Sequence, residues 1–144
     1  MSPYSRIFRY EVLSPEGPID AAEAVSAVFP ARDGQVGVLA DRAPLAAVLG
    51  AGAMSFHRPD GTLREYFLAG GFAQVRSGTL TILAECCIPA ERLDRHKAME
   101  ELQLARQAAS QGRGRTAGCN EALEAARRKV GMVERLLRQK AATA

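Results

Sequence analysis

Apolar and polar residues alternate in short runs through the first part of the chain, as is typical of β-strands. From Arg6 to Ser14, the side chains of Phe8, Tyr10 and Val12 fall on one side of a pleat, which predicts a half-buried strand. Two pairs of similar runs flank tight-turn residues at 59–61 and 77–78. The expected strands are 25–29, 36–39, 53–58, 63–68, 72–76 and 79–84. Many short strands with turns between them predict an antiparallel β-sandwich or barrel.

The second part of the chain has a helical period instead. Two stripes of apolar residues recur at spacings of three and four, within residues 91–109 and 121–140. Glycines interrupt the segment 110–120 between them, and Asn120 is suited to cap the second helix. The pattern therefore predicts an antiparallel hairpin of two helices. The stripes consist of Ala98, Leu102, Ala105 and Ala109, and of Leu123, Ala126, Val130, Val133 and Leu137.

Composition changes sharply at Pro89, where the two patterns meet. All seven prolines and all eight aromatic residues lie at or before it, and 12 alanines follow it. Residues 1–89 contain seven arginines and nine acidic residues, which gives a net charge of −2. Residues 90–144 contain twelve basic and seven acidic residues, which gives a net charge of +5. We therefore expect an α+β chain with two domains: a β-sandwich at 1–89 and a helical hairpin at 90–144. Because its stripes are rich in alanine, the hairpin buries little apolar area and could dock, open or extend.

Several classes of protein are excluded or disfavoured. The longest stretch without a polar side chain, 43–54, is too short for a membrane span of about 20 residues and contains Pro44. Three cysteines, two of them adjacent, argue against a disulfide framework. The first ten residues have neither a signal-peptide nor a transit-peptide pattern, which favours a cytosolic location.

Candidate catalytic groups are few. His57 and His96 are expected on the surface, and Cys86 and Cys87 as half-buried side chains near the junction. No second cysteine pair stands at zinc spacing, since Cys119 is alone, so no metal site is expected. A small hydrolase that uses Cys86 or Cys87 is the weakest hypothesis, because neither has an identified base. We therefore expect no catalytic residue.

Three segments together resemble one family. Residues 34–45 (GQVGVLADRAPL) are similar to the G-x-x-G-[IV]-L-P-G-H-x-P-L stretch of the epsilon subunit of F-type ATP synthases. Residues 70–75 (GGFAQV), followed by 83–85 (LAE), resemble the family's G-G-F-x-E-V signature and the strand that follows it, and 12–17 (VLSPEG) its opening. The glycines also have a purely structural reading, because a Gly pair in a strand usually marks a bend.

The resemblance implies a non-catalytic rotor subunit in the central stalk. Such a subunit links the gamma subunit to the membrane c-ring for proton-driven ATP synthesis, and its C-terminal hairpin inhibits ATP hydrolysis. The implied location is peripheral, on the cytoplasmic face of a bacterial cell membrane, with one copy in the complex. The ring-contact residues carried over are Asp33, Gln35, Asp41 and Arg42. Ala40-Asp41-Arg42 replaces the family's P-G-H, which alters the polar pairing expected there.

A nucleotide site is a further implication of the resemblance. Some bacterial members bind ATP through [IL]-D-x-x-R-A, and residues 93–98 read LDRHKA, so Asp94 and Lys97 are the candidate residues. Lys97 keeps the charge of the motif's Arg but loses its planar fork. Asp94 is equally suited to the start of a helix, where the dipole favours an acid. No cofactor is expected, with regulatory ATP as the alternative.

The second helix is strongly basic, and three interpretations remain open. Its charge could simply be solvated, could contact nucleic acid through phosphates, or, as the family implies, could meet acidic residues of the catalytic beta subunits when the hairpin extends. The lack of aromatic residues disfavours nucleic acid, but a stand-alone module that binds nucleic acid is the alternative function, and a salt-titrated DNA-binding assay discriminates the two. The residues expected to inhibit are Arg127, Arg128, Arg135 and Arg138, with Lys129 and Lys140 beside them.

Overall fold

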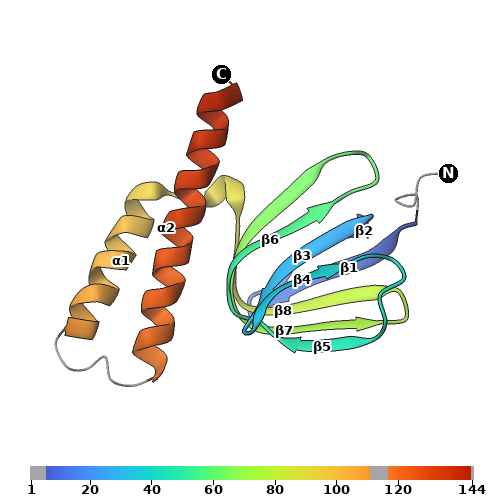
Figure 1. Ribbon diagram of the computed structural model, residues 1–144, viewed down its shortest axis with the longest axis horizontal. Coiled ribbons are helices and arrows are strands. Elements are labelled where there is room, and N and C mark those ends of the chain that lie inside the picture. The colour runs from blue at the N-terminus through green and yellow to red at the C-terminus, as the bar shows by residue number, and fades with distance from the viewer. Residues whose placement is uncertain (1–5, 111–116, 144) are drawn as a thin grey trace. The chain divides into compact units, whose positions relative to one another are not determined.

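The computed structural model describes residues 6–110 and 117–143. The chain divides into two compact units, Met1–Pro89 and Ala90–Ala144. Within the described residues, the strands all lie in the first unit and the α-helices in the second (Figure 1).

The described part of the first unit contains eight strands. Hydrogen-bonded neighbours follow the order β2-β1-β8-β7-β6-β3-β4, and β5 pairs with β7. The bounds are β1 Phe8–Ser14, β2 Gly17–Ala24, β3 Ser26–Ala31, β4 Gly34–Val38, β5 Leu45–Val48, β6 Ala51–His57, β7 Leu63–Arg76 and β8 Thr79–Pro89.

The long hairpin of β7 and β8 belongs to both layers of the sandwich. The first half of β7 pairs with β6 and its second half with β5. Strand β8 follows β7 along nearly its whole length, but pairs with β1 only over residues 79–83. One layer is therefore β4-β3-β6-β7-β8 and the other β5-β7-β8-β1-β2. The predicted α+β class, with a β-sandwich first, is confirmed.

Large apolar and aromatic side chains fill the space between the layers. The rings of Tyr10 and Phe56 stack with their centroids 3.9 Å apart, and Tyr66 meets Phe56 edge-on at 6.2 Å. Each such side chain contributes about 1.5–3 kcal/mol when fully buried. The core also contains Val12, Phe29, Met54, Leu68, Leu80 and Ile82, all fully buried.

Gly70 and Gly71 form the corner at which the hairpin passes from one layer to the other. Their φ angles are +76° and +119°, which side chains rarely adopt. The β7–β8 ladder skips the pair Gly70–Glu85. Before this corner the even-numbered side chains of Tyr66 and Leu68 are buried in the core, and after it the odd-numbered side chains of Ala73 and Val75 are. A Cβ on Gly71 would collide with the backbone oxygen of Leu83. The structural reading of this glycine pair as a bend is thus correct.

Two features of the sandwich differ from the sequence expectation. The pairing of β1 with β8 is parallel, whereas the other strand pairs are antiparallel. Turn residues report only on neighbouring strands, so a pairing across seventy residues leaves no local signal. Strands β2 and β5 were not expected, because Ala and acidic residues dominate the first and the second is only four residues long.

The described part of the second unit is a hairpin of two helices. A 3-10 turn at Ala90–Arg92 precedes α1 (Arg95–Ser110), and α2 spans Ala117–Thr143. The helices lie side by side and run in opposite directions (Figure 1). Lys129 Nζ donates to Glu101 Oε2 at 2.6 Å, which links them. Ala98, Leu102, Ala126, Met132 and Val133 are buried. The predicted helical hairpin is confirmed.

The helix ends correct two expectations. Helix α2 begins at Ala117, so Asn120 lies inside it and the predicted cap is wrong. Leu137, expected in the apolar stripe, is largely exposed. The connecting glycines Gly112 and Gly114 lie outside the described residues.

Candidate interaction surfaces

An apolar row crosses the outer face of the layer that contains β5 and β1. Val48 on β5 is paired with Phe72 on β7, and Phe72 with Leu83 on β8. These three side chains are 42%, 60% and 50% exposed. Leu13 on β1 continues the row beside Leu83. Because these exposed apolar side chains are contiguous, the row is a candidate interaction surface.

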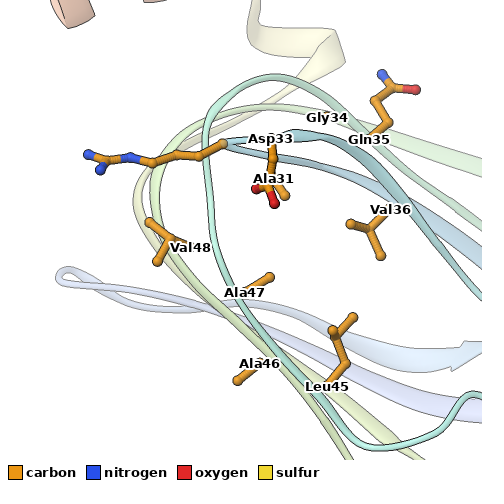
Figure 2. A pocket seen from close by; sticks show the side chains of 10 residues that line it. Ala31, Asp33, Gly34, Gln35, Val36, Leu45, Ala46, Ala47 and Val48 are labelled. Atoms are coloured by element: carbon orange, nitrogen blue, oxygen red, sulfur yellow. The ribbon is translucent and has the colours of Figure 1, made fainter.

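The tip of the β3–β4 hairpin carries two of the predicted ring-contact residues, Asp33 and Gln35. Both are exposed, and they line a groove of about 480 Å³ between β4 and β5. Figure 2 shows Val36 and Leu45 pointing toward each other across this groove, while Gln35 points away from it. The floor is apolar, because Ala31, Val36, Leu45 and Ala47 also pack against the sandwich core.

Asp41 and Arg42, the other two ring-contact candidates, lie at the opposite end of β4. From Gln35 to Val38 alone, the strand spans about 10 Å, at about 3.3 Å per residue. Asp41 is held by Arg6, whose Nη1 donates to both carboxylate oxygens at 2.9 and 2.8 Å. The structure therefore does not bring the four residues into one cluster, although all four are exposed.

A polar cluster at the edge of the core was missed by sequence reasoning. Asp20 Oδ2 accepts hydrogen bonds from Tyr10 Oη at 2.8 Å and Tyr66 Oη at 2.7 Å, and Arg58 Nη2 lies 3.1 Å from the same carboxylate. Burial acts to raise the pKa of Asp20, but the two tyrosine hydrogen bonds and the charge of Arg58 outweigh it, so this pKa lies below its ordinary value. Burial raises the pKa of Tyr66.

This cluster has a structural role because its members come from both layers. Tyr10 lies on β1 and Tyr66 on the first half of β7, while Asp20 lies on the edge strand β2. The sequence signal for this cluster is weak. Asp20 lies on β2, whose residues have low strand propensity, so a single sequence does not distinguish this strand from a loop.

The two candidate nucleotide-binding residues lie at the start of α1. Asp94 Oδ1 accepts a hydrogen bond from the backbone N–H of His96 at 2.9 Å, which is the geometry of an N-cap. Lys97 follows in the first turn and is exposed. Capping accounts for Asp94 without a ligand.

The four arginines predicted to inhibit share one face of α2. At about 100° per residue they fall within an arc of about 100°. Three of them are exposed, and Arg135 is half-buried. Arg128 Nε donates to Glu124 Oε1 at 3.0 Å, and neighbouring Lys129 is held by Glu101. Carboxylates of the hairpin thus already neutralise part of this basic surface.

The remaining chemical candidates are dispersed. Cys86 and Cys87 are half-buried free thiols, and burial raises the pKa of Cys87 to about 12. His57 is exposed, and His96 Nε2 lies 3.0 Å from Glu100 Oε1. The side chain of Cys119 lies outside the described part. Among the described residues, no three His, Cys, Asp or Glu side chains gather as metal ligands would.

Neither described helix combines the length and apolar character that crossing a bilayer requires. The features above define a class of protein: a β-sandwich with an exposed apolar row, followed by a helical hairpin with one basic face. Residues 7–90 match the family model of the ATP synthase delta/epsilon chain, β-sandwich domain. This chain belongs to that family, and the resemblance to the epsilon subunit is confirmed.

Relatives and solved structures agree with this assignment. The chain is 32% identical over 99 residues to an ATP synthase epsilon chain of Allorhizobium ampelinum, covering 69% of this chain and 73% of that one. It is 32% identical over 107 residues to the epsilon chain of Desulfitobacterium hafniense, covering 74% and 80%. A chain of the Euglena gracilis mitochondrial ATP synthase (OSCP/F1/c-ring) shares the fold at a TM-score of 0.71 and 22% identity, over 89% of this chain and 79% of that one.

Proposed function

We propose that this chain is a non-catalytic central-stalk subunit of an F-type ATP synthase. In this proposal the sandwich links the gamma subunit to the membrane c-ring for proton-driven ATP synthesis, and the hairpin inhibits ATP hydrolysis. Family membership supports the subunit role. The complex would hold one copy, at the cytoplasmic face of a bacterial cell membrane. The observation that carries the docking function is the exposed row of Val48, Phe72 and Leu83.

The gamma subunit is the proposed partner of this apolar row. The centre of an interface is apolar and enriched in aromatic residues, and a few side chains there supply most of the binding energy. Co-purification with gamma tests the assignment. The double variant Phe72→Ser, Leu83→Ser should bind gamma at least about thirtyfold more weakly, since each side chain contributes about 1–2 kcal/mol or more.

A matched control comes from the same strand. Leu63 is also exposed, but it lies in the other half of β7 and outside the row. Leu63→Ser should therefore bind gamma as the wild type does. Equal binding by the double variant, or equal loss by the control, would show that the row is not the docking surface.

The c-ring is the proposed partner of the loops at either end of β4. Asp33 and Gln35 at one end, and Asp41 and Arg42 at the other, are exposed polar residues suited to hydrogen bonding. Because β4 lies between the two pairs, they would touch different parts of the ring or different partners. Cross-linking from a cysteine at position 35 and from one at position 41 distinguishes these cases.

The basic face of α2 is the proposed inhibitory element. When the hairpin extends, Arg127, Arg128, Arg135 and Arg138 would meet acidic residues of the catalytic beta subunits. Replacing all four with Ala should raise ATP hydrolysis by the reconstituted complex about tenfold, if each exposed ion pair contributes about 0.3–1 kcal/mol. As a control, Ala at Arg92, Arg95, Lys97 and Arg106 removes the same charge from the first half of the hairpin and should leave the rate unchanged.

Binding of a regulatory ATP is the last property that the family implies. The capping bond of Asp94 and the loss of the motif's Arg at Lys97 weigh against it. Equilibrium dialysis with millimolar ATP should show no uptake; saturable uptake that Lys97→Ala abolishes would reverse this view.

A further inference from the structure

The two ends of the sheet order are protected to very different degrees. Strand β2, at one end, contains Pro18, Asp20 and Glu23, and its pairing with β1 has an irregularity at Val12/Leu13. Prolines, charges and bulges are the devices that keep an edge strand from pairing with another chain. Strand β4, at the other end, reads GQVGV and contains none of them. Its edge is therefore open to pairing.

The pairing with β3 shows which groups of β4 face this open edge. Pro30 is opposite Gln35, and its carbonyl accepts from Gly50 N–H at 2.9 Å, on the side away from β4. Pro30–Gln35 is therefore a pair without mutual hydrogen bonds, and the next pair of this kind is Val28–Gly37. The backbone N–H and C=O groups of Gln35 and Gly37 accordingly point outward.

The open edge lies along the apolar groove between β4 and β5. Ala31, Val36, Leu45 and Ala47 form its floor, and its volume is about 480 Å³. A strand that paired with β4 would place every second side chain over this floor. The groove is thus suited to an extended segment with small or apolar residues at alternate positions.

We propose that the β4 edge binds such an extended segment of a partner polypeptide by strand addition, with main-chain hydrogen bonds to Gln35 and Gly37. This inference rests on the proposed function, because the partner is a neighbouring subunit of the assembled enzyme. A second copy of this chain fits less well. Its own Val36 and Val38 already face its own core, so they could not fill the groove, and pairing of two five-residue edges alone falls far short of the area of a stable dimer.

Gly37 allows a sharp test at a single position. A Cβ there would meet nothing within 4 Å, so Gly37→Ala should fold normally and keep its N–H group. Gly37→Pro removes that N–H group, and an edge strand tolerates proline. We expect Gly37→Pro to assemble about tenfold more weakly with the other subunits, and Gly37→Ala to assemble as the wild type does.

Hydrogen exchange on the wild-type chain gives a second measurement that does not depend on the folding of any variant. The amides of Gln35 and Gly37 should exchange at least about tenfold more slowly in the assembled ATP synthase than in the free chain. If the chain assembles but these amides exchange at the same rate in both, strand addition is wrong and the proposed function stands. If the chain does not assemble at all, the proposed function itself fails.

Sedimentation of the free chain tests whether the β4 edge pairs with a second copy of this chain instead. A monomer supports the proposal. A dimer that Gly37→Pro converts to monomer would show that the edge pairs with a second copy, and would overturn the assignment to a partner polypeptide.

Discussion

The sandwich and the helical hairpin are stabilised in different ways. The sandwich buries stacked aromatic rings and a run of large aliphatic side chains, and a hydrogen-bonded cluster around Asp20 ties both layers together. Among the described residues of the hairpin five are buried, and two of these are alanines. Since stability grows with buried apolar area, the hairpin should be the weaker part. This difference is the one that the proposed function needs, with docking by the sandwich and rearrangement of the hairpin.

Spectroscopy can follow the two parts separately. Every aromatic residue lies within the first unit, so near-ultraviolet circular dichroism reports on the sandwich alone. The signal at 222 nm comes mainly from α1 and α2. On heating, we expect the helical signal to fall first and the aromatic signal later. A single coincident transition would show that the two parts unfold as one unit.

Gly71→Ala should have the largest effect on stability, and this effect should fall on the sandwich. The positive φ and the collision with Leu83 O leave no room for a Cβ, and the obstacle is backbone that cannot move aside. We expect a loss of more than about 3 kcal/mol in unfolding free energy, measured by urea titration of the near-ultraviolet signal. Gly78→Ala, a turn glycine of positive φ with open space around it, should lose only about 1 kcal/mol.

Leu102→Ala should have the next largest effect on stability, and this effect should be confined to the hairpin. Leu102 is only 7% exposed, and its truncation should cost about 2–3 kcal/mol, enough to reduce the helical signal at 25 °C. Leu104, two positions further along α1, is 66% exposed, so Leu104→Ala should change stability by less than about 0.5 kcal/mol. A parallel loss of the aromatic signal in Leu102→Ala would contradict the separation of the two parts.

Asp20→Asn should weaken the sandwich by about 1–3 kcal/mol at pH 7, because a charged acceptor of three hydrogen-bonding groups is lost. The folded state lowers the pKa of Asp20, so the folded chain binds fewer protons there than the unfolded chain. This contribution is present above about pH 4 and disappears as the pH falls further. The variant should therefore lose less stability on acidification than the wild type, as measured by urea titration of the near-ultraviolet signal.

Asp94→Ala should have the smallest of these effects, about 1 kcal/mol on the hairpin, through loss of the cap of α1. Asp94→Asn keeps an oxygen that can accept the N–H of His96 and should restore most of the helical signal. If Asn fails to restore it, the carboxylate has a role other than capping.

The sequence predicts the parts of this molecule that depend on neighbours in the chain. Alternation in β1, the two hairpin turns and the period of both helices lie within short windows, and the structure contains β1, both turns and both helices. The pattern predicts two strands, at 63–68 and 72–76, where the structure has the single strand β7. The reason is that the Gly pair bends the ladder without ending it. The sequence likewise indicates that Asp33, Gln35 and most of the α2 arginines are exposed.

The rest depends on residues far apart in the chain. The parallel pairing of β1 with β8, the Asp20 cluster and the pairing of Val48 with Phe72 each join strands that no local pattern connects. The same holds for Asp41, which the motif groups with Gln35 and which the length of β4 separates from it. Family motifs supplied the function, but only the register of the strands identified which side chains stand together.

The shared β7–β8 hairpin has a mechanical consequence. Two layers in contact through side chains alone can slide over each other, because dispersion contacts re-form after a small shift. Here a hydrogen-bonded ribbon crosses from one layer to the other at Gly70 and Gly71, so sliding would have to break backbone pairs. The sandwich should therefore resist shear, a property that the proposed role in a rotating stalk would require.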